Sequence, residues 1–186
     1  LCLGDSLTAG YGVEKEQAWP WLLQEQLKKD FPQKNFVVIN GGESGATTAS
    51  ALPRLKWFMK NKLDFLILAL GANDGLRVVD LDQAKENLNR AIDLAKKAEM
   101  KIILAGMKMP PNFGKAYQEK FSQMYRDLAQ AWKIQMIPFL LEGIGGEKEM
   151  NLDDGIHPNP KGQEKMLQNI YAVLKPMIKL YSSQLS

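Results

Sequence analysis

The sequence contains a single histidine, His157, and a single cysteine, Cys2. One thiol cannot form a disulfide within the chain, and one Cys with one His cannot build a structural zinc site from those residue types alone. The cysteine content is therefore compatible with either a reducing or an oxidising compartment. If the chemistry of this protein needs an imidazole as general base, His157 is the one candidate.

Long apolar runs and nucleotide-binding motifs are also missing. No stretch of 18 consecutive apolar residues occurs, so we expect no transmembrane helix, and no signal peptide is visible. Neither Gly-x-Gly-x-x-Gly nor the P-loop pattern is present, and we expect no cofactor. Gly-x-Ser-x-Gly is absent too, because Thr8 stands where the second glycine would follow Ser6, which argues against an α/β-hydrolase with a nucleophile elbow.

Charge of one sign is not in excess either, since the formal net charge is +3 and charged residues make up 24% of the chain. The lysines are scattered over helical stretches, which favours solvated helix faces and argues against a nucleic-acid partner. The 186 residues show no repeat and no linker. We therefore expect one domain, residues 1–186, and a monomer.

Strand and helix signals alternate along the chain. Apolar residues at three- and four-residue spacing predict helices, and Pro53 should kink or restart an early one. Asn159 and Pro160 are a good cap and first residue for the last helix. The alternation predicts an α/β fold, a three-layer αβα sandwich with a flavodoxin-like, mainly parallel five-stranded sheet. The strands are expected at residues 1–3, 36–39, 65–68, 101–104 and 134–141, and the clearest helices at residues 81–95, 121–128 and 166–177.

The first strand, Leu1-Cys2-Leu3, reads as the end of a longer buried strand. We therefore expect residues upstream of Leu1 in the natural chain, where a targeting segment could stand.

Polar or glycine-rich segments follow each predicted strand. In a parallel sheet these segments meet at the carboxyl edge, where ligands bind. A serine hydroxyl needs a base, and the base needs a third group to orient it; Ser6, His157 and Asp154 supply these three types. Asp154 precedes His157 by three residues, about one turn of chain, whereas Asp153 should point elsewhere. The converging segments are residues 4–6, 40–45, 71–75, 107–112 and 142–158.

Four ordered strings carry a resemblance to a known family. They are Gly4-Asp5-Ser6-Leu7, Gly45, Gly71-Ala72-Asn73-Asp74 and Asp154-Gly155-Ile156-His157, and they resemble the sequence blocks of the SGNH hydrolases, also called GDSL esterases. The longer strings from Gly4 to Gly12, Gly71 to Arg77 and Met109 to Gly114 look like the branch of bacterial thioesterases, lysophospholipases and arylesterases. The resemblance spans essentially the whole chain and implies the SGNH hydrolase fold.

The resemblance also implies roles for single residues. Ser6 would be the nucleophile, His157 the general base and Asp154 the group that orients the imidazole. The oxyanion hole would consist of the backbone N–H groups of Ser6 and Gly45 and the side-chain amide of Asn73. Ala46 departs from the family pattern, in which an acidic residue often stands at this position.

The resemblance implies acyl esters and thioesters as substrates, among them lysophospholipids, acyl-CoA and aryl esters. It also implies a periplasmic or secreted enzyme, with a cytoplasmic location still open, and transient contact with a lipid surface. No metal is implied. Apolar residues after the third and fourth strands suit an alkyl chain, although ordinary loop packing would explain them equally well. They are Leu76, Val78, Val79, Met109, Pro110, Pro111 and Phe113.

Two other functions stay open at this point. An SGNH carbohydrate acetylesterase would carry sugar-stacking aromatic and polar residues near these loops, which here are mostly apolar. A flavodoxin-like binding module without catalysis would leave Ser6 unreactive towards an organophosphonate.

Overall fold

Five parallel strands form the centre of the structure, a computed structural model that describes residues 1–183. Their order across the sheet is β2-β1-β3-β4-β5, the order of flavodoxin-like sheets. The predicted α/β class and the parallel sheet are thereby confirmed. The strands are β1 (Cys2–Gly4), β2 (Asn40–Gly42), β3 (Phe65–Ala69), β4 (Lys101–Ala105) and β5 (Gln135–Ile137).

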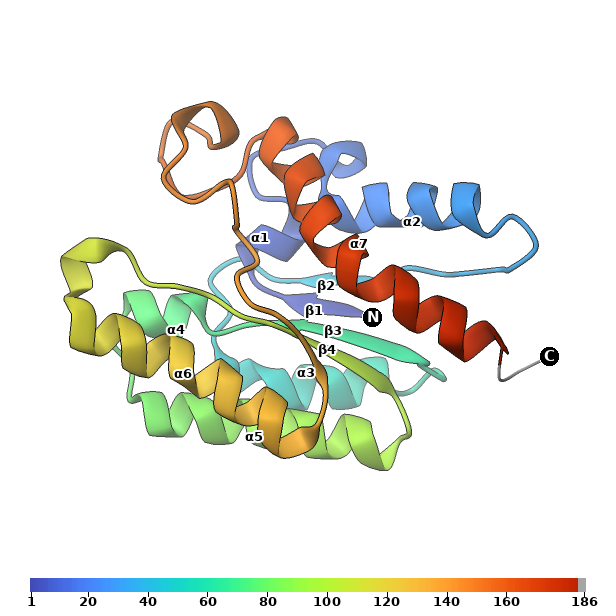
Figure 1. Cartoon of the computed structure of the whole chain (residues 1–186), viewed down its shortest axis with the longest axis horizontal. Helices are drawn as coiled ribbons and strands as arrows, with labels where there is room; N and C mark the ends of the chain where they lie inside the picture. Colours follow the sequence, from blue (N-terminus) through green and yellow to red (C-terminus); the bar gives the residue numbers. More distant parts are fainter. Residues whose placement is uncertain (184–186) are drawn as a thin grey trace.

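Helices cover both faces of the sheet (Figure 1). The long helices α2 and α7 lie on one face, and α3, α5 and α6 lie on the other, so that the sheet is the middle of three layers. The short helices α1 and α4 begin where β1 and β3 end. The α-helices are α1 (Ser6–Ala9), α2 (Trp19–Asp30), α3 (Ala51–Phe58), α4 (Ala72–Leu76), α5 (Leu81–Lys97), α6 (Lys115–Trp132) and α7 (Pro160–Ser183), and short 3₁₀ helices span Lys15–Gln17, Thr48–Ser50, Pro111–Phe113 and Lys148–Met150.

The hydrophobic pattern explains where these elements form. β3 is apolar at all five positions because both of its faces are covered. α5 is capped by Asp80, whose side chain accepts the N–H of Asp82, and α7 by Asn159, whose side chain accepts the N–H of Gly162. The apolar stripe of α5 is buried against the sheet as the periodicity predicts: Leu81, Ala84, Leu88, Ala91, Ile92 and Ala95.

Two of the strand predictions are wrong, one in position and one in length. Residues 36–39 form no strand, because β1 pairs with β2 only from Cys2 opposite Asn40 onward and no described strand lies opposite the earlier residues. The strand predicted for 134–141 ends at Ile137, because Pro138 has no N–H to continue the ladder. Pro53 lies in the first turn of α3, which restarts after the 3₁₀ turn Thr48–Ser50, as predicted.

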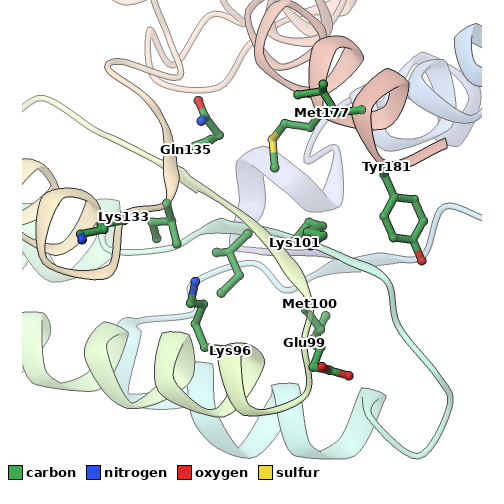
Figure 2. Close-up of a pocket in the computed structure, with 11 residues that line it drawn as sticks. Lys96, Glu99, Met100, Lys101, Lys133, Gln135, Met177 and Tyr181 are labelled. Carbon is green, nitrogen blue, oxygen red and sulfur yellow. The ribbon is translucent and has the colours of Figure 1, made fainter. Parts of the chain in front are cut away.

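Within residues 1–183, no helix is both long enough and apolar enough to cross a bilayer. A hollow at the amino ends of β4 and β5 is lined by residues such as Lys101, Gln135 and Met177 (Figure 2). None of the predicted catalytic residues lines it.

The contact of α1 with the end of β2 gives a stability prediction. A Cβ on Gly42 would stand 2.1 Å from the backbone nitrogen of Ala9, so that Gly42→Ala must push two backbone segments apart. Overpacking of this kind costs about 1–3 kcal/mol, and we expect the upper end. Urea denaturation measures the loss in unfolding free energy.

Gly146→Ala is the matched control. Gly146 has a φ of 83° but nothing within 4 Å of an added Cβ, so only the left-handed backbone is strained, at roughly 1 kcal/mol. Equal losses for the two variants would contradict the packing argument.

Candidate active site

Ser6 stands at the carboxyl end of β1, as the first residue of α1. Its predecessor, Asp5, caps this helix, since the carboxylate accepts the N–H of Leu7 at 3.0 Å. β1 lies between β2 and β3, where the strand order reverses. Ligands of open α/β sheets bind at this switch point, so that Ser6 occupies the position where a reacting group is expected.

His157 and Asp154 meet Ser6 although 151 residues separate His157 from Ser6. The distance from His157 Nε2 to Ser6 Oγ is 3.0 Å, and that from His157 Nδ1 to Asp154 Oδ2 is 2.7 Å. A neutral ring that donates from Nδ1 to the carboxylate has a free lone pair on Nε2, which can accept the Ser6 hydroxyl proton. The three predicted residues therefore form one continuous hydrogen-bonded chain.

Asp154 also holds the backbone that carries the imidazole. Its Oδ1 accepts the N–H groups of Ile156 and His157 at 2.8 and 2.9 Å, and these bonds, with that from the imidazole, lower the pKa of the carboxyl to about 2. The group is thus a carboxylate throughout the neutral range. Asp153, its neighbour, is exposed and has no side-chain partner among the described residues.

Further contacts fix the loop before α7. The N–H of Leu152 donates to the His157 carbonyl at 2.8 Å, and Asn151 pairs with Pro158 in a short antiparallel bridge. The ring of Tyr11 lies 4.5 Å from that of His157, centre to centre. Sequence reasoning gave Tyr11 no role, although it is part of the string Gly4 to Gly12.

Two backbone donors at this edge are free. Within residues 1–183, neither the N–H of Ser6 nor that of Gly45 has a hydrogen-bond acceptor. The side-chain amide of Asn73 donates one hydrogen to the Ala46 carbonyl at 2.9 Å, which orients the group and leaves its second hydrogen available. Gly45 has a φ of 80°, a backbone conformation that favours glycine.

Buried contacts position the Asn73 turn. A Cβ on Gly71 would stand 2.2 Å from the hydroxyl of Tyr125, which donates to the Leu70 carbonyl at 3.0 Å. The carboxylate of Asp74 accepts the backbone N–H and the hydroxyl of Thr48, at 2.9 and 2.6 Å. Asp74 therefore ties α4 to the segment that follows Gly45.

Arg54 is the main residue that sequence reasoning missed. From α3 its guanidinium donates to the carbonyls of Gly4 and Gly41 and pairs with Glu43. No pattern in the sequence marks it, because the same short helix also carries the cation Lys56.

The residues predicted for the acyl pocket differ in how deeply they are buried. Leu76 and Val78 are exposed beside the Asn73 turn, and Phe113 is partly buried. Met109 belongs to the hydrophobic core, where its sulfur would stand 2.6 Å from a Cβ on Gly75. The remaining members lie at or near the surface: Val79, Pro110 and Pro111. The acyl pocket stays a prediction.

No group of three or more His, Cys, Asp or Glu side chains in the described part of the chain is arranged to hold a metal ion.

Burial raises the pKa of Asp5 to about 6, and the Leu7 N–H and the nearby His157 oppose this rise only in part.

Comparison with known proteins shows the family of the chain. A profile of the GDSL-like Lipase/Acylhydrolase family matches residues 2–165. The chain is 37% identical to "Esterase TesA" of Pseudomonas aeruginosa over 96% of its length and 88% of that protein. It is 33% identical to "Thioesterase 1/protease 1/lysophospholipase L1" of Escherichia coli, over 96% and 84%. The crystal structure of the psychrotrophic esterase EstA of Pseudoalteromonas sp., inhibited by monoethylphosphonate, superposes with a TM-score of 0.88 at 30% identity, covering 96% of this chain and 97% of EstA.

The neighbouring aspartates offer a matched pair of variants. Asp154→Asn should lower kcat by about 10⁴-fold, because its one acceptor oxygen would stay with the backbone N–H groups and its NH2 would donate to Nδ1, which favours the wrong tautomer. Asp153→Asn should stay within twofold of wild type. Steady-state hydrolysis of an aryl ester measures both, and comparable activities would mean that Asp154 does not orient the base.

The buried Asp5 predicts a pH dependence of stability. Because its folded-state pKa of about 6 lies above the usual value of 3.8, the folded protein retains a proton that the unfolded chain has lost. The contribution of Asp5 to the free energy of unfolding is therefore fully present below pH 3.8. It falls by roughly 3 kcal/mol as the pH rises to about 6.

Asp5→Asn keeps an oxygen that caps the helix and removes the titratable carboxyl group. Urea unfolding of both proteins at pH 4 and pH 8 should show the variant gaining relative to wild type as the pH rises. An unchanged difference would exclude a raised pKa at Asp5.

Proposed function

This chain belongs to the GDSL-like Lipase/Acylhydrolase family and is an esterase, and we propose that it hydrolyses acyl esters and thioesters through an acyl-enzyme on Ser6. The observation that carries the proposal is the unbroken contact from Ser6 Oγ through His157 to Asp154, at 3.0 and 2.7 Å. A hydroxyl, an imidazole and a carboxylate in this order constitute an activated nucleophile.

In acylation, His157 Nε2 removes the Ser6 proton as Oγ attacks the carbonyl carbon of the substrate. The Asp154 carboxylate, with its lowered pKa, stabilises the imidazolium that forms. The imidazolium then donates this proton to the departing alcohol or thiol, which leaves the acyl group on Ser6.

Deacylation repeats these steps with water as the nucleophile. His157 takes a proton from water, the hydroxide attacks the acyl carbon, and the proton returns to Ser6 Oγ as the carboxylic acid leaves. Both halves pass through a tetrahedral oxyanion, which the free N–H groups of Ser6 and Gly45 and the second amide hydrogen of Asn73 would bind. Each such donor typically contributes about 3 kcal/mol to lowering the barrier.

The surroundings of Ser6 favour an apolar acyl group. Four of the exposed large apolar side chains are close in sequence to Ser6, Asn73 or His157, and the ring of one of them, Tyr11, lies against that of His157; they are Tyr11, Leu76, Val78 and Ile156. Lysophospholipids, acyl-CoA and aryl esters fit this character, as do the names of the relatives. Transient contact with a lipid surface and a periplasmic or secreted location remain part of the proposal.

Labelling with a fluorophosphonate tests the nucleophile. The wild-type protein should incorporate one probe per chain, and Ser6→Ala should incorporate none and lose esterase activity, because no other hydroxyl is hydrogen-bonded to the His157 ring in the described residues. Ser122→Ala, on α6, is the control and should label normally. Labelling of Ser6→Ala at the wild-type rate would place the nucleophile elsewhere.

The same protein should then be assayed on p-nitrophenyl esters and acyl-CoA thioesters from acetyl to palmitoyl, with lysophosphatidylcholine and an acetylated sugar. The proposal predicts kcat/KM above that for acetyl with longer acyl chains. A maximum at acetyl, with rapid release of acetate from the sugar, would favour the carbohydrate acetylesterase instead.

A further inference from the structure

One arginine joins the two segments that carry the backbone donors of the proposed oxyanion hole. Arg54 Nη1 donates to the Gly4 carbonyl at 3.0 Å, and Nη2 donates to the Gly41 carbonyl. Its Nε lies 3.0 Å from the carboxylate of Glu43. Gly4 stands two residues before Ser6, and Glu43 stands two residues before Gly45, so that one side chain spans both approaches to the site.

The strand ladder alone does not hold these segments. The last registered pair of β1 and β2 is Gly4 opposite Gly42, and one further bond runs from the Glu43 N–H to the Gly4 carbonyl at 3.1 Å. Beyond this point the chain at Ser6 turns into α1, and the chain at Gly45 turns back towards α3. Arg54 lies where the strand pairing ends, and its side chain joins the two segments there.

We propose that Arg54 is a positioning residue for the oxyanion hole, one that fixes the spacing between the Ser6 and Gly45 N–H groups. The inference rests on the function proposed above. Arginine suits the task because its planar guanidinium presents five donors in a fixed fork, which can bond two carbonyls and a carboxylate at once. The side chain is only 16% exposed, which limits competition from water.

Misplaced donors would affect the transition state more than the bound substrate. Loss of one oxyanion donor costs about 10²–10³-fold in kcat, and displacement by 1 Å can cost about 10²-fold. We therefore expect removal of the fork to lower kcat by roughly 10–100-fold. KM should change by less than about threefold, because the ground-state carbonyl needs these bonds less.

The experiment compares Arg54→Lys and Arg54→Gln with wild type on p-nitrophenyl butyrate, with folded enzyme counted by fluorophosphonate titration. Lys56→Gln, an exposed cation on the same helix, is the matched control and should behave as wild type. An alkylboronic acid, which forms a tetrahedral adduct on serine, should lose affinity by the factor by which kcat/KM falls. The pH midpoint of kcat/KM should stay at its wild-type position, since the Ser6–His157–Asp154 contacts are untouched.

A purely structural role predicts a different result. Arg54→Gln would then unfold at lower temperature and give less titratable enzyme, but each titrated site would keep the wild-type kcat and boronate affinity. That outcome overturns the proposal, and so does a loss confined to KM.

Glu43→Ala covers the case in which neither Arg54 variant folds. Glu43 is 63% exposed, so its substitution should be tolerated, and alanine removes one of the three acceptors of Arg54. A fall of about threefold or more in kcat at unchanged KM would support the proposal, and a wild-type kcat would overturn it. Hydrolysis by wild type and inactivity of Ser6→Ala establish the serine esterase separately, so failure of the Arg54 proposal leaves that result standing.

Discussion

The parallel pairing of β1 with β2 on one side and β3 on the other is the constraint on which the site depends. Because all three strands run in the same direction, their carboxyl ends deliver Ser6, Gly45 and Asn73 to one edge of the sheet. The approach is close, since a Cβ on Gly4 or on Gly42 would collide with the first turn of α1. Small residues at the strand ends therefore let the proposed nucleophile and the proposed oxyanion donors lie close together.

His157, the proposed catalytic base, reaches this edge from the far end of the chain, and a neighbouring residue orients it. One carboxylate, Asp154, orients the imidazole with one oxygen and caps the surrounding turn with the other. The backbone bonds hold its pKa at about 2, so that Asp154 is charged throughout the neutral range, as its proposed role of stabilising an imidazolium requires. Arg54 has the corresponding role on the donor side, where it cross-links the segments before Ser6 and Gly45.

The sequence allowed the fold class to be predicted, because strand and helix periods alternate and each strand is followed by a polar turn. It failed at residues 36–39, since apolar character indicates burial and not pairing, and at Pro138, which ended the ladder early. Arg54 could not be foreseen, because its bonds to Gly4 and Gly41 depend on the register of two strands. The acyl pocket stays a prediction because apolar residues such as Met109 suit a core as well as a pocket.

The solitary histidine makes the central claim directly measurable, because ¹⁵N-labelled protein will show the resonances of one imidazole. The account predicts a neutral ring protonated on Nδ1, with a proton resonance shifted far downfield by the bond to Asp154. That resonance should vanish in Asp154→Asn, and phosphonylation of Ser6 should perturb Nε2. A neutral ring protonated on Nε2, or one that is insensitive to Ser6 and Asp154, would contradict the relay from Ser6 through His157 to Asp154.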